Sequence, residues 1–182
     1  GSADEFRLLT DAVGEKGYRQ IDINLGCPFP MIAGKHKGAG MLLYPAQVAE
    51  VLAPIAEYPE IQFSLKMRLG WENASECMVL FDLLNTLRLS RIALHARTGK
   101  QQYKGHPDLE AFQGFYELCQ HPLYYNGGIE SLSDIRQILT RFPLLKGVFI
   151  GRGLLSSPLL AKEFKGNETF LPEQRMSIYF AF

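Results

Sequence analysis

The sequence has few cysteines, no long apolar run and no net charge. Its three cysteines form no Cys-x-x-Cys pair, which argues against a disulfide framework and indicates free thiols in a reducing, cytoplasmic compartment. No apolar stretch approaches the roughly 20 residues that span a membrane, and no signal-peptide pattern opens the chain. The 19 lysines and arginines balance 19 aspartates and glutamates. This balance excludes a grossly basic nucleic-acid binder, although it still permits a local basic face.

What is present fits one globular domain. The 182 residues are 47% hydrophobic, which is enough for a core and too much for disorder. Ser2 followed by Glu5 predicts a helix N-cap near the start. Pro172 opens an apolar, helix-like run that reaches Phe182. A helix face left this exposed is unusual, so the sequence predicts a fragment of a larger protein.

Strand and helix patterns alternate five times along the chain. Such alternation predicts a parallel sheet with helical crossovers, as a doubly wound sheet or as a (β/α)8 barrel. We expect strands at residues 21–25, 63–68, 92–97, 123–125 and 147–150, and helices at residues 45–56, 74–87, 108–118 and 131–141.

Polar residues within the strands favour the barrel. Four of the five predicted strands carry Asn24, Lys66, His95 or Asn126 in the phase opposite the aliphatic one. A doubly wound sheet buries both faces and needs almost wholly apolar strands. In a barrel the polar phase points inward and gathers at the C-terminal mouth, where active sites lie. Because five strands cannot close an eight-stranded barrel, the prediction is a partial TIM barrel.

The candidate catalytic thiol is Cys27, which follows the first strand in Gly26-Cys27-Pro28. A thiol at a barrel mouth can act as an acid or a nucleophile, but a free cysteine is also a small apolar filler. Both interpretations remain open for Cys27, whereas Cys77 and Cys119 fall in helical patterns and are predicted to pack. An inward Lys66 needs water or an anion, which could be an electron-rich cofactor group or Asp22.

His95 and Arg97 share the inward phase of the third strand. Their place beside Lys66 favours a site at the mouth, although a histidine alone is more often a satisfied core residue. The loops after the last two strands are Asn126-Gly127-Gly128 and Gly151-Arg152-Gly153. Their exposed N–H groups with a nearby arginine indicate a phosphate site, as after strands seven and eight of barrels. Tight turns with positive φ are the alternative.

Two predicted mouth loops are basic and contain no acid. Residues 27–49 and 95–107 both follow strand ends, and Tyr103 lies among the cations of the second loop. Such a rim suits a polyanion such as RNA, although lysines on loops are often merely solvated. The predicted RNA contacts are Lys35, Lys37, Arg97, Lys100 and Lys104.

Six ordered motifs together resemble the tRNA-dihydrouridine synthases, FMN enzymes built on a (β/α)8 barrel. The resemblance runs from about residue 20 to about residue 160 and implies barrel strands four to eight in residues 1–165. Residues 166–182 would begin a truncated C-terminal helical region that grips tRNA. The motifs are Asn24-Leu25-Gly26-Cys27-Pro28, Gly38-Ala39-Gly40-Met41-Leu42-Leu43, Lys66-Met67-Arg68-Leu69-Gly70, His95-Ala96-Arg97-Thr98, Asn126-Gly127-Gly128-Ile129 and Gly151-Arg152-Gly153.

The resemblance also implies roles for individual residues. Cys27 corresponds to the family's proton donor, and Asn24 lies beside the substrate pocket. Reduced FMN would give hydride to C6 of a flipped-out uracil, Cys27 would give a proton to C5, and NADPH would reduce the flavin again. Pro30 departs from the lysine or arginine that family members often have there. The implied FMN contacts are Lys66, His95, Asn126, Gly127, Gly128, Gly151 and Arg152.

Two other functions are compatible with the same residues. Another FMN barrel oxidoreductase, of the dihydropyrimidine or dihydroorotate type, would share the phosphate site, although the strand-end cysteine and basic rim favour RNA. An inactive RNA-binding fragment is the second. No metal site and no membrane contact are predicted. The two open edges of a partial barrel predict self-association of the fragment.

Overall fold

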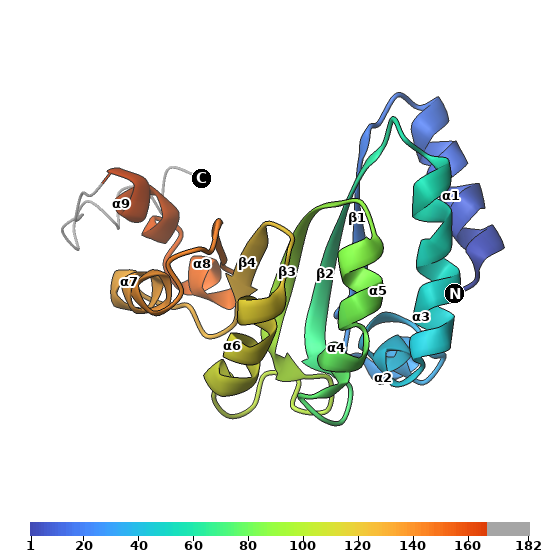
Figure 1. Cartoon of the computed structure of the whole chain (residues 1–182). Helices are drawn as coiled ribbons and strands as arrows, with labels where there is room; N and C mark the ends of the chain where they lie inside the picture. The colour runs from blue at the N-terminus through green and yellow to red at the C-terminus, as the bar shows by residue number, and fades with distance from the viewer. Residues whose placement is uncertain (167–182) are drawn as a thin grey trace.

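The computed structural model describes residues 1–166, which form an α/β fold around one parallel sheet (Figure 1). The strands are hydrogen-bonded in the order β1-β2-β3-β4-β5, so each strand lies beside its neighbour in sequence. All four pairings are parallel, which confirms the sheet expected from the alternating pattern. The strands are β1 (Gln20–Leu25), β2 (Gln62–Gly70), β3 (Leu89–Thr98), β4 (Leu123–Asn126) and β5 (Gly147–Phe149).

The four helices predicted between the strands are present, two of them with differences in extent. The helix expected over residues 45–56 ends at Leu52 and continues as a 3₁₀ turn, because Pro54 cannot donate an α-helical hydrogen bond. The helix expected over residues 74–87 is two short helices that meet at Leu80. The helices are α1 (Ala3–Glu15), α2 (Pro30–Ala33), η1 (Gly38–Leu43), α3 (Pro45–Leu52), η2 (Ala53–Glu57), α4 (Glu76–Val79), α5 (Phe81–Thr86), α6 (Leu109–Leu118), α7 (Leu132–Arg141), α8 (Arg152–Ser156) and α9 (Leu160–Gly166). Of these, α2, η1, α8 and α9 were not predicted.

Side-chain caps set three of the helix starts. The Ser2 hydroxyl accepts from the N–H of Glu5 at 3.2 Å, as the sequence predicts. Asp108 caps α6 in the same way, and Ser131 with Asp134 forms a full capping box at the start of α7. Each cap satisfies N–H groups that the first helical turn leaves unbonded. The local sequence therefore fixes where these crossover helices begin.

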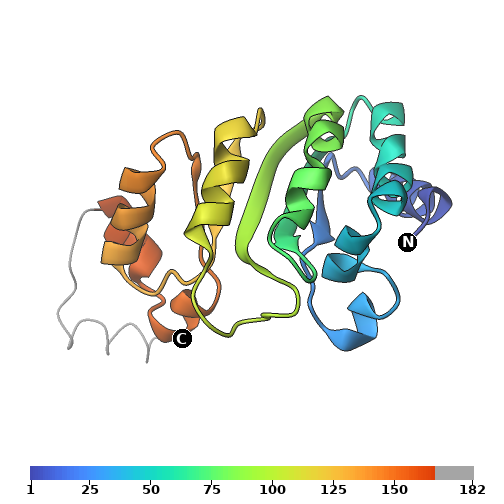
Figure 2. The ribbon, with the colours of Figure 1, turned by 60° about the horizontal axis from the view of Figure 1, so that its bottom comes forward.

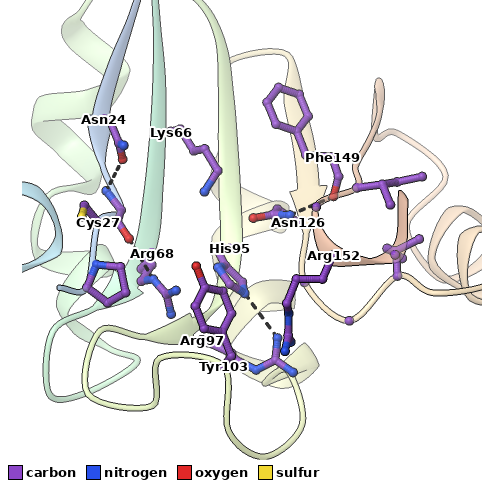
Figure 3. A pocket seen from close by; sticks show the side chains of 18 of the residues that line it. Asn24, Cys27, Lys66, Arg68, His95, Arg97, Tyr103, Asn126, Phe149 and Arg152 are labelled. Atoms are coloured by element: carbon purple, nitrogen blue, oxygen red, sulfur yellow. Dashed lines mark hydrogen bonds between the residues drawn. The ribbon is translucent and has the colours of Figure 1, made fainter. Parts of the chain in front are cut away.

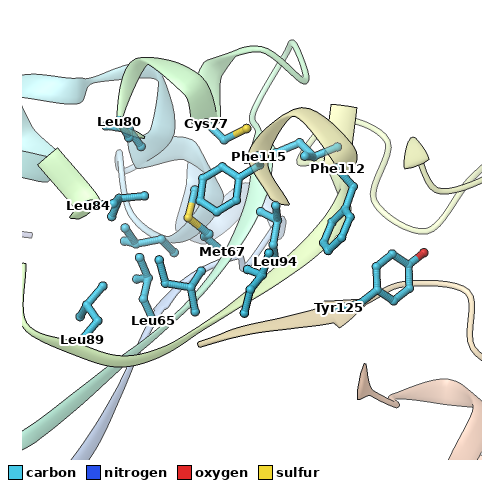
Figure 4. Close-up of a cluster of buried hydrophobic side chains, with 14 of the residues drawn as sticks. Leu65, Met67, Cys77, Leu80, Leu84, Leu89, Leu94, Phe112, Phe115 and Tyr125 are labelled. Atoms are coloured by element: carbon cyan, nitrogen blue, oxygen red, sulfur yellow. The ribbon is translucent and has the colours of Figure 1, made fainter. Parts of the chain in front are cut away.

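The aliphatic phase of the strands faces the helices and forms the core. Leu65, Met67 and Leu94 are fully buried against Phe112 and Phe115 of α6 (Figure 4). Residues of α3, α5 and α7 join the same cluster. Because one phase of every strand supplies this core, the helices that cover it pack on one face of the sheet (Figure 2). A doubly wound fold would need helices on both faces.

The opposite face of the sheet carries the polar phase. Asn24 pairs in register with Lys66, and Arg68, His95 and Asn126 form a neighbouring row across β2, β3 and β4. This one-sided covering is compatible with part of a TIM barrel, in which the polar face would be the interior. The predicted helical region 166–182 lies outside the described residues, apart from Gly166 at the end of α9. Within residues 1–166, no helix combines the length and apolarity needed to cross a membrane.

The two outer strands lead to a prediction about association. Among the described residues, β1 pairs with β2 and β5 pairs with β4, which leaves one edge of each outer strand without a strand partner. Unpaired strand edges are templates for pairing with another chain. We expect the 182-residue chain to self-associate, or to melt less cooperatively than a closed barrel, in light scattering and thermal unfolding. A monomer with one sharp, reversible transition would contradict this expectation.

Candidate active site

A cavity of about 370 Å³ opens at the carboxyl ends of the strands. The sequence predicts polar side chains at this edge, because parallel strands end together there. Figure 3 shows side chains from β1, β2, β3 and β4 directed into one space. The structure brings together Cys27, Asn24, Arg97 and every predicted cofactor contact, namely Lys66, His95, Asn126, Gly127, Gly128, Gly151 and Arg152.

The turn after β1 holds Cys27 at the cavity wall. The N–H of Gly26 donates to Asn24 Oδ1 at 2.9 Å, and the carbonyl of Cys27 accepts from the N–H of Ala39 at 2.9 Å. Gly38 has a φ of 55°, and a Cβ there would lie 2.8 Å from the Cys27 carbonyl oxygen. Glycine is therefore required for this close approach. The thiol is half-buried and sits on a turn braced from two sides.

Arg68 braces the same turn, and our prediction of the site omitted it. Its side chain is 1% exposed, and its Nε donates to the carbonyl of Gly26 at 2.9 Å. Its Nη1 donates to the carbonyls of Thr98 at 2.9 Å and Gln102 at 2.8 Å. One guanidinium thus ties the loop after β1 to the loop after β3. The alternation along β2 could have indicated Arg68, because it lies two residues after Lys66 and therefore on the same inward face.

His95 is neutral and its tautomer follows from its neighbour. Arg97 Nη1 lies 3.3 Å from His95 Nε2, and a guanidinium can only donate, so Nε2 is the acceptor and Nδ1 carries the proton. Burial lowers the pKa of His95 to about 3, with further contributions from Arg68, Lys66, Arg97 and Arg152. At neutral pH the ring therefore offers one N–H donor without adding charge.

Lys66 projects into the cavity from the middle of β2. Burial lowers its pKa, with repulsion by Arg68 as the second cause and attraction by Asp22 opposing them. Within residues 1–166 the structure shows no salt bridge to Lys66, because Asp22 instead accepts from the Ser64 hydroxyl and lies 3.8 Å from Arg91. The structural salt bridge considered for Lys66 is therefore absent there, and an anion in the cavity would stabilise the ammonium.

The glycine loops approach the cavity closely. Gly127 and Gly128 have φ values of 132° and 63°, and a Cβ on Gly127 would lie 3.1 Å from the His95 ring. A Cβ on Gly153 would lie 2.1 Å from the carbonyl oxygen of Ile129. Asn126 Nδ2 donates to the carbonyl of Phe149 at 2.8 Å and ties the two loops together. The loop after β4 therefore has the positive φ values of a tight turn, whereas Gly151 after β5 has a φ of −101°. Both loops line the cavity, and the phosphate site stays a prediction.

Tyr103 lies between two cations at the mouth, and our site prediction omitted it as well. The Arg152 guanidinium is 4.7 Å and the Arg68 guanidinium 5.5 Å from the centre of its ring. The His95 ring centre lies 6.4 Å away. The ring is 47% exposed, so these cation–π contacts form at the rim. The sequence showed an aromatic residue within the basic loop but not its position over the cavity.

The cavity has the donors that a phosphate-bearing cofactor needs. Lys66, Arg68, Arg97 and Arg152 all line it. Arg97 is 4% exposed, and its Nε has no hydrogen-bond partner among the described residues. A buried donor of this kind costs free energy unless something accepts from it. The residues present therefore fit an anionic group, and their neutral amide, imidazole and glycine neighbours fit the polar edge of a ring.

Four predicted RNA contacts lie outside the cavity lining. Lys37 pairs with Glu5 at 2.9 Å, and Lys100 pairs with Glu72 at 2.6 Å. Lys35 and Lys104 are exposed on the loops after β1 and β3. None of the four lysines lines the cavity, so their contact with RNA stays a prediction. Among residues 1–166, no cluster of three histidine, cysteine or acidic side chains is placed to hold a metal ion.

Comparison with known proteins gives the family. The model of the family described as Dihydrouridine synthase (Dus) matches residues 6–180. The tRNA-dihydrouridine synthase B of Vibrio vulnificus (strain CMCP6) is 28% identical over 174 residues, which cover 92% of this chain and 54% of that protein. The tRNA-dihydrouridine(16) synthase of Haemophilus ducreyi (strain 35000HP / ATCC 700724) is 32% identical over 156 residues, covering 84% of this chain and 48% of that protein.

A further relative shows the same partial coverage. The probable tRNA-dihydrouridine synthase of Rhizobium leguminosarum bv. phaseoli is 32% identical over 139 residues, which cover 76% of this chain and 44% of that protein. The chain thus spans about half the length of the curated relatives it matches. The family model covers nearly the whole sequence. The chain therefore belongs to the dihydrouridine synthase family.

Proposed function

We propose that the chain is part of an FMN-dependent enzyme that reduces uridine to dihydrouridine in tRNA, with NADPH as the reductant. The observation that carries this proposal is a strand-end thiol, Cys27, in the same cavity as four cationic side chains. Family membership supports the reaction, and the one-sided sheet supports a partial TIM barrel of strands four to eight. Residues 1–165 would then form the catalytic domain.

The cavity residues divide into groups by their chemistry. Arg152 and the N–H of Gly151 would hold the FMN phosphate, together with Gly127 and Gly128. Lys66 would neutralise electron-rich atoms of the flavin ring, and neutral His95 would donate through Nδ1. Asn126 would keep the two glycine loops at a fixed spacing through its bond to Phe149. When bound, reduced FMN would supply hydride for C6 of the uracil.

Cys27 would complete the reaction by moving a proton. Saturation of the C5–C6 bond requires hydride at C6 and a proton at C5, and the Cys27 thiol would donate that proton and take another from water. The target base must leave its stack to enter the cavity, where Asn24 lies next to the turn that holds Cys27. Arg97, Lys35, Lys37, Lys100 and Lys104 would attract the tRNA phosphates toward the mouth.

The activity assay tests this proposal. The protein, FMN and NADPH are incubated with an unmodified tRNA transcript, and the nucleosides are analysed by mass spectrometry for uridine that has gained two hydrogens. Omission of either FMN or NADPH should abolish the gain. Turnover of free dihydropyrimidine bases or dihydroorotate without tRNA turnover would overturn the proposal in favour of another flavin barrel reaction.

Arg152→Ala is expected to weaken FMN binding about 30-fold. The reason is the loss of a charge-assisted hydrogen bond to the phosphate, which is worth about 2 kcal/mol. Flavin fluorescence titration measures the change, and riboflavin, which lacks the phosphate, should bind wild type and variant alike. Lys146→Ala is the control, because this exposed lysine precedes β5 at the opposite end of the sheet. An unchanged FMN affinity would remove Arg152 from the phosphate site.

A further inference from the structure

The segment after Cys27 displays apolar side chains to solvent. Phe29 is 63% exposed and Met31 80% exposed, and Ile32 next to them is 39% exposed. Phe29 also lines the mouth of the cavity. Neither the proton donor nor the flavin contacts account for this patch. Adjacent exposed apolar side chains beside a cavity usually mark a contact surface.

The backbone holds Phe29 in a defined place. Its carbonyl accepts from the N–H groups of Ile32 and Ala33, both at 2.9 Å, at the start of α2. Pro30 occupies the first position of that turn, where its fixed φ suits a helix. Ala33 is buried beneath the turn. The aromatic ring is therefore carried on an ordered support, which lowers the entropic cost of using it for binding.

The surroundings of Phe29 are basic and aromatic. Lys35, His36 and Lys37 follow in the same segment, and of these Lys37 pairs with Glu5 of α1. The His36 ring stacks on Tyr44 with centroids 4.2 Å apart and an angle of 17° between the rings. The exposed Tyr103 also lines the cavity, and in sequence it lies between Lys100 and Lys104. Each of the two loops thus combines an aromatic ring at the cavity with basic residues in the same segment, and the cavity itself is cationic.

We propose that Phe29 stacks on the base of a nucleotide next to the target uridine. A flipped base leaves its neighbours partly unstacked, and an aromatic ring at the mouth can cover the exposed face of one of them. Aromatic rings beside lysines are the chemistry that binds single-stranded RNA. A second copy of this chain is disfavoured as the occupant, because it would bring one cationic mouth against another. This inference rests on the proposed tRNA substrate and assigns Phe29 as a positioning residue.

Binding of a labelled RNA stem-loop with one uridine in the loop tests the stacking. Phe29→Ala should lose between about 5-fold and 150-fold in affinity, the range found for base–aromatic stacking. Phe29→Trp should retain the affinity within about twofold, since the stacking surface remains. The salt dependence should stay the same in both variants, because no cation is removed. Tyr18→Ala is the control: Tyr18 is also 63% exposed but precedes β1 at the far end of the sheet.

The same RNA with an abasic site on the 5′ or the 3′ side of the uridine identifies the partner. On one of these RNAs the difference between wild type and Phe29→Ala should vanish, because the base that stacks is missing. Equal affinities of wild type and Phe29→Ala for the intact RNA would overturn the stacking alone. Failure of the wild-type protein to bind RNA would overturn the proposed substrate as well. Dissociation of an oligomer by Phe29→Ala, with unchanged RNA affinity, would assign the patch to a second copy.

Discussion

Replacing Cys27 with serine is expected to slow uridine reduction by about 10² to 10⁴-fold, the usual contribution of a general acid. Hydride arrival at C6 builds negative charge at C5 and O4, and a proton must reach C5. Serine keeps the size of the side chain, but its hydroxyl is a far weaker acid than a thiol. The bonds that brace the turn involve backbone atoms of Gly26 and Cys27, so they survive the substitution.

A single-turnover assay isolates this step. The variant is loaded with FMN, reduced with NADPH and mixed with tRNA, and dihydrouridine is measured over time. Flavin reduction and RNA binding should match the wild type. Cys77→Ser and Cys119→Ser serve as controls, because Cys77 is fully buried in the core and Cys119 packs at the end of α6, both away from the cavity. Reduction by Cys27→Ser at the wild-type rate would mean that another group donates the proton.

Acid should destabilise the protein through His95. The pKa of this ring is about 3 in the folded state and about 6.5 in an unfolded chain. Between pH 3 and pH 6.5, His95 is protonated in the unfolded state and neutral in the folded state. The stability that depends on a neutral His95 is therefore fully present above pH 6.5 and decreases as the pH falls toward 3. The free energy of unfolding should fall by about 1.4 kcal/mol per pH unit, or about 2 kcal/mol from pH 7 to pH 5.

Urea unfolding at pH 7, 6 and 5 measures this effect. His95→Gln keeps a polar side chain that can still accept a hydrogen bond from Arg97 but cannot titrate. Between pH 7 and pH 5, the free energy of unfolding of this variant should therefore fall by about 2 kcal/mol less than that of the wild type. The comparison of slopes removes contributions of groups that titrate in both proteins. Identical slopes in wild type and variant would show that the folded protein accommodates the imidazolium.

Much of the fold could be predicted because its determinants are local. The alternation in β2 and β3 gives both the strands and the face that each side chain uses, and Ser131 with Asp134 gives the start of α7. The break at Leu80 could not be predicted, since an apolar run of that length suits one helix as well as two. Membership of this sheet in a TIM barrel depends on long-range strand pairing, so the partial barrel stays a prediction.

In the candidate site, too, the residues set by local sequence could be predicted and those set by long-range contacts could not. Residues at strand ends, such as Lys66 and His95, could be placed in the cavity from phase alone. Phase also places Arg68 on the inward face, but the roles of Arg68 and Tyr103 could not be predicted, because they depend on how the loop after β3 folds back over the turn after β1. Lys37 and Lys100 pair with Glu5 and Glu72, which lie far from them in sequence, so these ion pairs could not be predicted from the composition of the loops.

The sequential order of the strands has a consequence for how the chain is made. Each strand pairs with the next one synthesised, with one crossover between them. On the ribosome, β2 therefore finds β1 already outside the exit tunnel, and each later strand joins an existing edge. No described strand has to wait for a partner several units downstream, which keeps loop closure short at every addition. The sheet can thus grow in the direction of translation, one strand and one helical crossover at a time.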